Sequence, residues 1–83
     1  MRLDKYLKVS RIIKRRTVAN EACDLGRVQI NNKPAKPSAE VKVGDVLTVR
    51  LGPKALRVRV EATPEVVKAA DAAQLYTVLG EEA

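Results

Sequence analysis

The stretch TVANEACDLGRVQI, residues 17–30, changes its hydrophobic period at Gly26. On its N-terminal side, apolar residues recur at the i, i+4 and i+7 spacing of one helical face: Val18, Ala22 and Leu25. On its C-terminal side, Val28 and Ile30 alternate with polar residues, as in a half-buried strand. Glycine readily adopts the left-handed conformation that ends a helix. The stretch therefore predicts a helix over residues 17–25, a stop at Gly26 and then a strand, which indicates an α+β protein.

A further helix, rich in basic residues, is predicted upstream, over residues 2–9. Its apolar residues share one face and its cations share the other. The packing face holds Leu3, Tyr6 and Leu7, and the exposed face holds Arg2, Lys5 and Lys8. Ser10 interrupts the pattern, and residues 11–16 form a short basic connector. Thr17 is expected to be the N-cap of the next helix, because its hydroxyl can accept a hydrogen bond from a free backbone N–H.

The residues beyond the first strand predict a small antiparallel sheet. Residues 31–34 have the Asn and Pro typical of a turn, and an irregular loop over 35–45 ends in a tight turn at residues 43–45. The next strand is predicted over 46–51, with a hairpin turn at 52–54. The returning strand has two sides: Leu56, Val58 and Val60 face inward, whereas Arg57 and Arg59 face outward.

The C-terminal segment is predicted to be helical. Thr63-Pro64-Glu65 resembles a helix start, since proline is tolerated in the first turn. Four apolar residues beyond it share a helical face: Ala72, Leu75, Tyr76 and Leu79. Residues 80–83 are expected to fray. We therefore expect two helices packed on a small antiparallel sheet, a short C-terminal helix, and neither an internal repeat nor a second domain.

The composition restricts the class of protein. The chain has 83 residues, of which 46% are apolar and 31% charged, as in one small globular domain. It contains no histidine, so it lacks the commonest general base, a histidine metal ligand and any Ser-His arrangement. An enzyme is therefore the least expected class.

Cysteine and apolar content add further expectations. Cys23 stands alone, which rules out a disulfide within the chain and a cysteine-based metal site, and we expect it in the core. No apolar run approaches the ~18 residues of a membrane span, and the basic start lacks the apolar stretch of a signal peptide. We expect a cytoplasmic protein without metal or other cofactor.

Positive charge is concentrated at the N-terminal end. Residues 1–20 hold seven Lys or Arg and one acid, for a net +6, whereas residues 21–60 sum to +4 and residues 61–83 to −4. This asymmetry indicates one surface that binds a polyanion, with phosphate as the expected target. The seven cations are Arg2, Lys5, Lys8, Arg11, Lys14, Arg15 and Arg16.

Two interpretations of this cluster are open. Solvated side chains on a soluble helix are the plainer one, but seven cations opposed by Asp4 alone repel one another unless a polyanion binds. Free N–H groups at the start of the second helix and the planar fork of arginine both suit phosphate. We favour RNA over DNA, because a sheet rather than a recognition helix follows the helix pair. The two tyrosines lie on predicted core faces, so we expect contacts to the backbone and shape of folded RNA rather than base stacking.

Several motifs together resemble the αL RNA-binding domain that is named after the fourth protein of the small ribosomal subunit. They are RLDKYL (2–7), SR (10–11), KRRT (14–17), GRVQIN (26–31), Lys36 and VGD (43–45). The resemblance covers about residues 1–50 and implies two RNA-contacting helices on a small, bent antiparallel sheet. Residues 1–62 are expected to form this domain, and residues 63–83 a helical extension with a frayed acidic tail.

The whole chain is similar to the free-standing RqcP-like family of bacterial ribosome-associated quality control. That likeness implies binding to the large ribosomal subunit through 23S rRNA, binding to peptidyl-tRNA after a stalled ribosome splits, and cooperation with the elongation factor RqcH in C-terminal alanine tailing. The implied RNA-binding residues are Arg2 and Arg16 most directly, then Lys5, Arg11, Lys14, Arg15 and Lys36, and the basic cluster adds Lys8. Asp4 matches the motif too, either as a carboxylate that orients arginines or as a direct contact to RNA or a partner protein.

Two alternatives stay open, and a monomer is expected in each. The first is the less similar ribosome-associated heat-shock protein of the same domain type, which repositions tRNA on blocked large subunits. The second is a protein-interaction module that uses its cations on acidic partners. Sequence features separate the first alternative poorly from the quality-control role.

Overall fold

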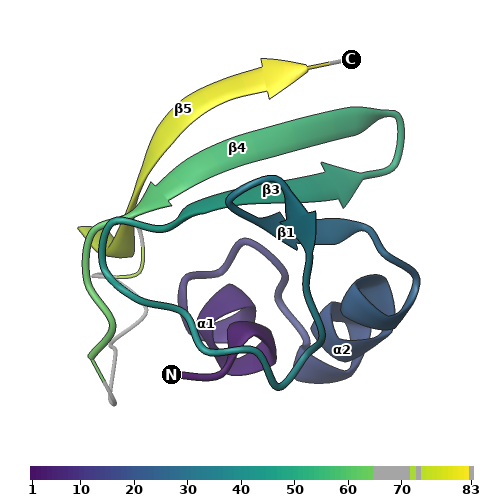
Figure 1. Cartoon of the computed structure of the whole chain (residues 1–83), viewed down its shortest axis with the longest axis horizontal. Helices are drawn as coiled ribbons and strands as arrows, with labels where there is room; N and C mark the ends of the chain where they lie inside the picture. The colour runs from purple at the N-terminus through teal and green to yellow at the C-terminus, as the bar shows by residue number, and fades with distance from the viewer. Residues whose placement is uncertain (65–71, 73, 83) are drawn as a thin grey trace.

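Two short helices lie against one face of a single antiparallel sheet (Figure 1). The computed structural model describes residues 1–64, 72 and 74–82. The helices are α1 (Leu3–Val9) and α2 (Arg16–Asp24). Within the described residues, no helix is long and apolar enough to cross a membrane. The predicted α+β class, with two helices on a small antiparallel sheet, is confirmed.

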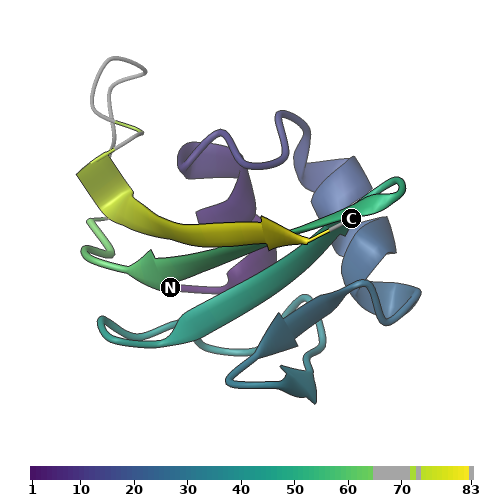
Figure 2. The same cartoon turned by 90° about the horizontal axis from the view of Figure 1, so that it is seen from above.

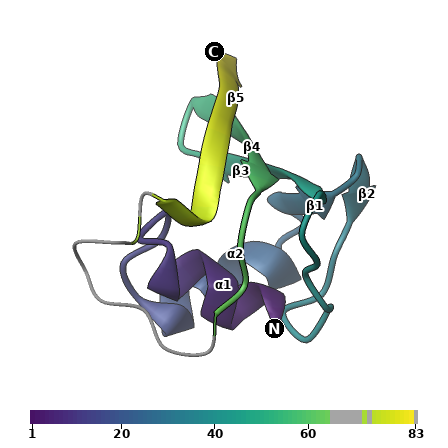
Figure 3. The same cartoon turned by 90° about the vertical axis from the view of Figure 1, so that its left-hand side faces the viewer.

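The sheet has five strands in the order β2-β1-β3-β4-β5, and each neighbouring pair is antiparallel. The strands are β1 (Val28–Ile30), β2 (Lys33–Pro34), β3 (Val46–Leu51), β4 (Lys54–Val60) and β5 (Tyr76–Glu82). The strands β2 and β5 form the two edges. Seen from above and from the side, the sheet lies across both helices and turns its second face away from them (Figure 2, Figure 3).

The helix α1 buries the apolar face that was predicted for it. Leu3, Tyr6 and Leu7 have no exposed surface and join the apolar core that the inward sides of β1, β3 and β4 also form. The buried strand residues are Val28, Leu47, Val49, Val58 and Val60. Arg57 and Arg59 alternate with the two valines on β4 and lie on the outward face, as predicted.

The start of α2 differs from the prediction. Thr17 is not the N-cap, because the helix already begins at Arg16. An N-cap residue needs an extended backbone, and Arg15 has it, with φ −118° and ψ 131°. No side-chain hydrogen bond caps this end, so its free N–H groups keep their capacity to donate.

The buried face of α2 is also offset from the predicted one. Ala22 is buried as expected, but the prediction that Val18 and Leu25 share this buried face is wrong, since their side chains are 47% and 58% exposed. The buried side consists of Ala19, Ala22 and Cys23, and it lies where α2 packs against α1. Small side chains allow the two helices to approach closely, so packing distance rather than hydrophobic periodicity selects this face.

Gly26 ends α2 as predicted. Its φ of +73° is left-handed. The N–H of Gly26 donates to the carbonyl of Cys23 at 3.0 Å, and the N–H of Arg27 donates to the carbonyl of Ala22 at 2.9 Å. This pair of bonds is the Schellman motif, which satisfies the last carbonyls of a helix. The chain then enters β1 directly, which fixes the position of Arg27 beside the sheet.

The turn predicted over residues 31–34 is confirmed only at Asn31 and Asn32, because Lys33 and Pro34 form β2, whereas the hairpin turn after β3 and the irregular loop are confirmed. Asn31 and Asn32 both have positive φ, 51° and 67°, as a two-residue turn between β1 and β2 requires. The turn between β3 and β4 contains Gly52, with φ +65°. Between β2 and β3 the chain is irregular, and its residues Pro37 and Ala39 accept hydrogen bonds from the first turn of α1. The loop therefore holds Lys36 close to the N-terminal helix.

The predicted C-terminal helix is wrong from Tyr76 onward, whereas Ala72, Gln74 and Leu75 have 3₁₀-helical backbone, with Ala72 and Leu75 buried. Tyr76 and Leu79 belong to β5, which pairs with β4. Residues 80–82 continue this strand rather than fray, whereas residues 65–71, 73 and 83 lie outside the described residues. β-Branched Thr77 and Val78 favour a strand, and β4 would otherwise present an unpaired edge. The boundary placed at residue 62 stays a prediction.

One buried hydroxyl ties the C-terminal segment to α1. The hydroxyl of Tyr6 donates to the carbonyl of Leu75 at 2.7 Å. Leu75 is 4% exposed and belongs to the same apolar core as Tyr6. The residue just before β5 is therefore fixed to the helix that carries the basic surface.

Candidate nucleic-acid interface

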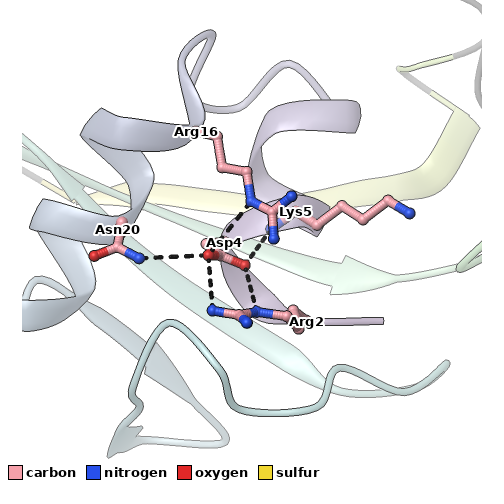
Figure 4. A network of polar contacts seen from close by, with 5 residues as sticks. All are labelled: Arg2, Asp4, Lys5, Arg16 and Asn20. Atoms are coloured by element: carbon pink, nitrogen blue, oxygen red, sulfur yellow. Dashed lines mark hydrogen bonds and ion pairs between the residues drawn. The ribbon is translucent and has the colours of Figure 1, made fainter.

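A buried carboxylate organises the first turn of α1. Asp4 is 2% exposed and accepts the backbone N–H of Lys5 at 2.8 Å. Arg2 approaches it with two donors, Nε to Oδ1 at 3.2 Å and Nη2 to Oδ2 at 3.3 Å. This fork-to-fork geometry fixes the plane of the guanidinium as well as its position (Figure 4).

The same carboxylate links α1 to α2. Arg16, the first residue of α2, places its Nε 3.5 Å from Oδ2 of Asp4. Asn20 lies one helical turn further along α2 and donates its amide to Oδ2 at 3.4 Å. In Figure 4 both side chains reach the carboxylate from α2, while Arg2 reaches it from the N-terminal side of α1. One acid thus positions two arginines that come from different helices.

The pKa of Asp4 is lowered from its ordinary value. Burial by itself raises this pKa, but the hydrogen bonds from Arg2 and the Lys5 amide and the charges of Arg16 and Arg2 outweigh burial. The carboxylate is therefore ionised at neutral pH. Two cations face one anion, so the group keeps a net positive charge.

Both arginines keep donors free for a ligand. The side chains of Arg2 and Arg16 are 52% and 47% exposed although each is bound to Asp4. A guanidinium has five N–H donors, and the ion pair uses only some of them. An anion would thus meet two arginines whose orientation is fixed before binding.

Lys36 joins this group from the loop between β2 and β3. A surface hollow of about 530 Å³ has Arg2, Asn20, Lys36 and Ser38 in its lining, together with one acid, Asp24. A neighbouring hollow of about 300 Å³ is lined by Asp4, Arg16, Thr17 and Asn20. We call Arg2, Asp4, Arg16, Asn20 and Lys36 the Asp4 surface. It unites three of the cations predicted from the sequence.

The other predicted cations lie elsewhere. Lys5 directs its ammonium group away from the carboxylate (Figure 4), and Lys8 and Arg11 are exposed. Lys14 and Arg15 line a separate groove of about 560 Å³ between the connector, α2 and the β3–β4 turn. None of these five cations forms an ion pair with a carboxylate among the described residues.

Three residues that line these surfaces were not predicted from the sequence. Asn20 could have been found, because it lies four residues after Arg16 and so on the same helical face. Arg27 and Arg50 line the groove of Lys14 and Arg15. Their proximity could not be predicted from the local sequence, because only strand pairing brings these two residues together.

Two further titratable groups, both in the core, do not ionise at neutral pH. Burial, followed by the charges of Asp4 and Asp24, raises the pKa of the Cys23 thiol to about 11. Burial, followed by Tyr76 and Glu61, also raises the pKa of Tyr6. Cys23 is 5% exposed, which confirms its prediction as a core residue.

Comparison with known proteins places this arrangement among RNA-binding folds. The S4 domain model matches residues 1–47. The chain is 55% identical over 82 residues to the RQC P-site tRNA stabilizing factor of Bacillus subtilis, covering 99% of this chain and 95% of the relative. It is 52% identical over 81 residues to the protein of the same name from Streptococcus pneumoniae, covering 98% and 92%. It is 36% identical over 75 residues to the heat shock protein 15 homologue of Haemophilus influenzae, covering 90% of this chain and 57% of the relative.

Solved structures share the fold. The trimeric structure of heat shock protein 15 from Vibrio cholerae superposes with a TM-score of 0.87 at 34% identity, covering 94% of this chain and 80% of that one. The solution structure of a hypothetical protein superposes with a TM-score of 0.82 at 30% identity, covering 99% and 100%. The two-helix motif and the sheet thus recur together in proteins of similar size.

Proposed function

Because the chain belongs to the S4 domain family, and within it to the proteins named RQC P-site tRNA stabilizing factor, we propose that it stabilises tRNA on the ribosome during quality control. In detail, it binds the large ribosomal subunit through 23S rRNA and holds the peptidyl-tRNA that remains after a stalled ribosome splits. It thereby supports the addition of C-terminal alanine tails by RqcH. It acts as a cytoplasmic, ribosome-associated monomer and as a binding protein without a catalytic step.

The observation that carries this proposal is the pair of arginines held on Asp4. Arg2 and Arg16 are oriented by one buried carboxylate and remain about half exposed. Arginines that are already ordered lose less side-chain entropy when they bind, so more of the contact energy is kept as affinity. Phosphate groups of folded RNA suit such a surface, because guanidinium groups bind them through two parallel hydrogen bonds.

The remaining proposed contacts surround this pair. Lys36 belongs to the Asp4 surface, and the other cations lie on α1 and the connector. They are Lys5, Lys8, Arg11, Lys14 and Arg15. Neutralising ~6 phosphates would lower the affinity by several powers of ten between low and moderately high salt. Asp4 contributes by orienting the arginines rather than by touching RNA.

Sedimentation with purified large subunits that carry peptidyl-tRNA tests the proposal. Arg2→Ala and Arg16→Ala should release the protein from the subunits while it remains folded. Arg59→Ala is the matched control, because Arg59 lies on β4, has a similarly exposed side chain and is bound to Glu61. Continued co-sedimentation of the Arg16→Ala protein at moderate salt would show that the Asp4 surface is not the contact.

A second candidate function is favoured by the likeness to heat shock protein 15. Both a curated relative and a solved structure carry that name, at 36% and 34% identity. In this function the protein repositions tRNA on blocked large subunits and does not take part in tailing. Deletion of the gene separates the two: loss of alanine tails supports the quality-control role, and intact tails support the heat-shock-type role.

A further inference from the structure

The outward face of the sheet carries three arginines that the Asp4 surface does not use. Arg27 directly precedes β1, Arg50 lies in β3 and Arg57 lies in β4. The N–H of Arg50 donates to the carbonyl of Arg27 at 2.9 Å, and Thr48 stands opposite Arg57 in the pairing of β3 with β4. Strand pairing therefore gathers three cations that are far apart in the sequence.

These arginines line one hollow of about 250 Å³. Polar side chains from Gln29, Asn32 and Thr48 complete its wall, and no aromatic residue lines it. Pockets for small organic molecules are larger, ~300–1,000 Å³, and mainly apolar. The size and the donors suit a phosphate group, and the missing aromatic platform excludes base stacking as the main contact.

The charges of the three arginines are not used within the protein. None of them forms an ion pair among the residues that the structure describes. By contrast, Arg59, which lies on β4 with Arg57, binds Glu61 at 2.7 Å. The Nε of Arg57 is buried and has no hydrogen-bond partner in the described part of the chain. Buried N–H groups are nearly always paired, so this group can donate to an acceptor that the described residues do not supply, such as the oxygen of a bound phosphate.

The lining of the hollow is positive: it contains three arginines and, among the described residues, no acid. Arg27 and Arg50 also line the groove that holds Lys14 and Arg15, so positive charge continues from the connector to the outward face.

We propose that Arg27, Arg50 and Arg57 form a second phosphate-binding surface, which holds the backbone of RNA on the outward face of the sheet. This inference rests on the proposed function only in taking RNA as the ligand. The surface adds affinity without reading sequence, because guanidinium groups contact phosphate and no group is placed to read a base. An RNA strand bound there can continue through the groove toward the connector.

Salt dependence of binding to purified large subunits, and in parallel to a folded tRNA transcript, tests the inference. Each lost phosphate contact lowers the slope of log affinity against log salt by about 0.7–0.9. Arg57→Gln should therefore lower the slope by about this amount. Arg59→Gln removes the same charge from the same strand and should leave the slope unchanged, because Arg59 is already bound to Glu61.

A triple variant, with Gln at positions 27, 50 and 57, enlarges the effect. The fall in affinity between about 50 and about 200 mM salt should shrink by roughly 20- to 40-fold relative to the wild type. Peptides that contain Arg27, Arg50 or Arg57 should also crosslink to RNA under ultraviolet light in the wild-type protein. This second measurement does not depend on the folding of any variant.

The outcomes separate this inference from the proposed function. If Arg16→Ala abolishes binding but the triple variant keeps the wild-type slope and the arginine peptides do not crosslink, the second surface does not exist. The triple variant could instead keep RNA binding and lose only a protein complex that, in the wild type, persists after nuclease treatment. In that case the surface binds an acidic protein and the inference is wrong. If the triple variant lowers the slope while Arg2→Ala and Arg16→Ala have no effect, the second surface stands and the proposed function loses its site.

Discussion

Asp4 has a structural role that follows from its burial. Two roles were compatible with the sequence, orientation of arginines and direct contact with a ligand. At 2% exposure, with its oxygens bound to Arg2, Arg16, Asn20 and the Lys5 amide, the carboxylate has little surface left for RNA. The geometry favours orientation.

Replacement of Asp4 by Asn should lower stability in a pH-dependent way. At pH 7 we expect a loss of roughly 1–2 kcal/mol, because the charged hydrogen bonds weaken and both arginines are partly exposed to solvent. The folded-state pKa is lowered, so the carboxylate stabilises the protein above its ordinary pKa of 3.8 and loses this contribution as the pH falls through the folded value. Urea unfolding at pH 7 and pH 3 checks this, with Glu21→Gln on the exposed side of α2 as the control. An Asp4→Asn deficit that is equal at both pH values would contradict the role of the charge.

The thiol of Cys23 should react slowly. Its pKa of about 11 and its 5% exposure both reduce the amount of accessible thiolate at pH 8. A colorimetric thiol reagent should modify the native protein far more slowly than the same protein in denaturant. Reaction of the folded protein as fast as the unfolded one would contradict the burial of this side chain.

At the level of elements, the sequence predicted those structures that local chemistry determines. The helix α1, the stop at Gly26 and the turn at Asn31 and Asn32 follow from side-chain spacing and backbone preference. The buried face of α2 could not be predicted, because the close approach to α1 selects alanines over Val18 and Leu25. The segment that forms β5 has apolar residues that fit helix or strand, and pairing with β4 decides between them.

Gly26→Ala should destabilise the end of α2. The residue has φ +73° and no atom lies within 4 Å of an added Cβ, so the cost is conformational and not steric. A left-handed conformation at a residue other than glycine costs roughly 1–2 kcal/mol. Thermal unfolding checks this against Gly80→Ala, which has equal space and no positive φ and should be nearly neutral. Equal effects of the two substitutions would show that the Schellman turn is not the reason for the glycine at position 26.

At the level of the molecule, the interface was only partly visible in the sequence. The resemblance and the cluster of cations identified Arg2 and Arg16, and the structure brings these two together on Asp4. It separates Lys14 and Arg15 from them, into another groove. Neighbours in sequence thus face different sides where the connector turns, and Arg27 and Arg50 become neighbours only through strand register. The sequence therefore gives the number of positive charges but not which of them lie together on one surface.

The stability of the RNA-binding motif depends on the described C-terminal residues. A chain that ends at residue 62 would lose β5, the buried Leu75 and the hydrogen bond from Tyr6. Burial of a leucine contributes about 1.5–3 kcal/mol and the hydroxyl bond about 1 kcal/mol, which is a large part of the stability of so small a domain. The boundary at residue 62 would then not mark the end of the folded unit.

Truncation therefore provides the test. We expect the chain of residues 1–62 to lose cooperative thermal unfolding, because its core opens beside α1 and β4 gains an exposed edge. A chain that ends at Gly80 is the matched control, since it keeps Leu75 and the pairs from Val60 to Arg57 and loses only the last two pairs of β5. Its midpoint should fall by a few degrees only. If residues 1–62 unfold as cooperatively as the full chain, the basic helices and the sheet are independent of β5, and the anchoring of Tyr6 to Leu75 has no part in holding Arg2 and Arg16 in place.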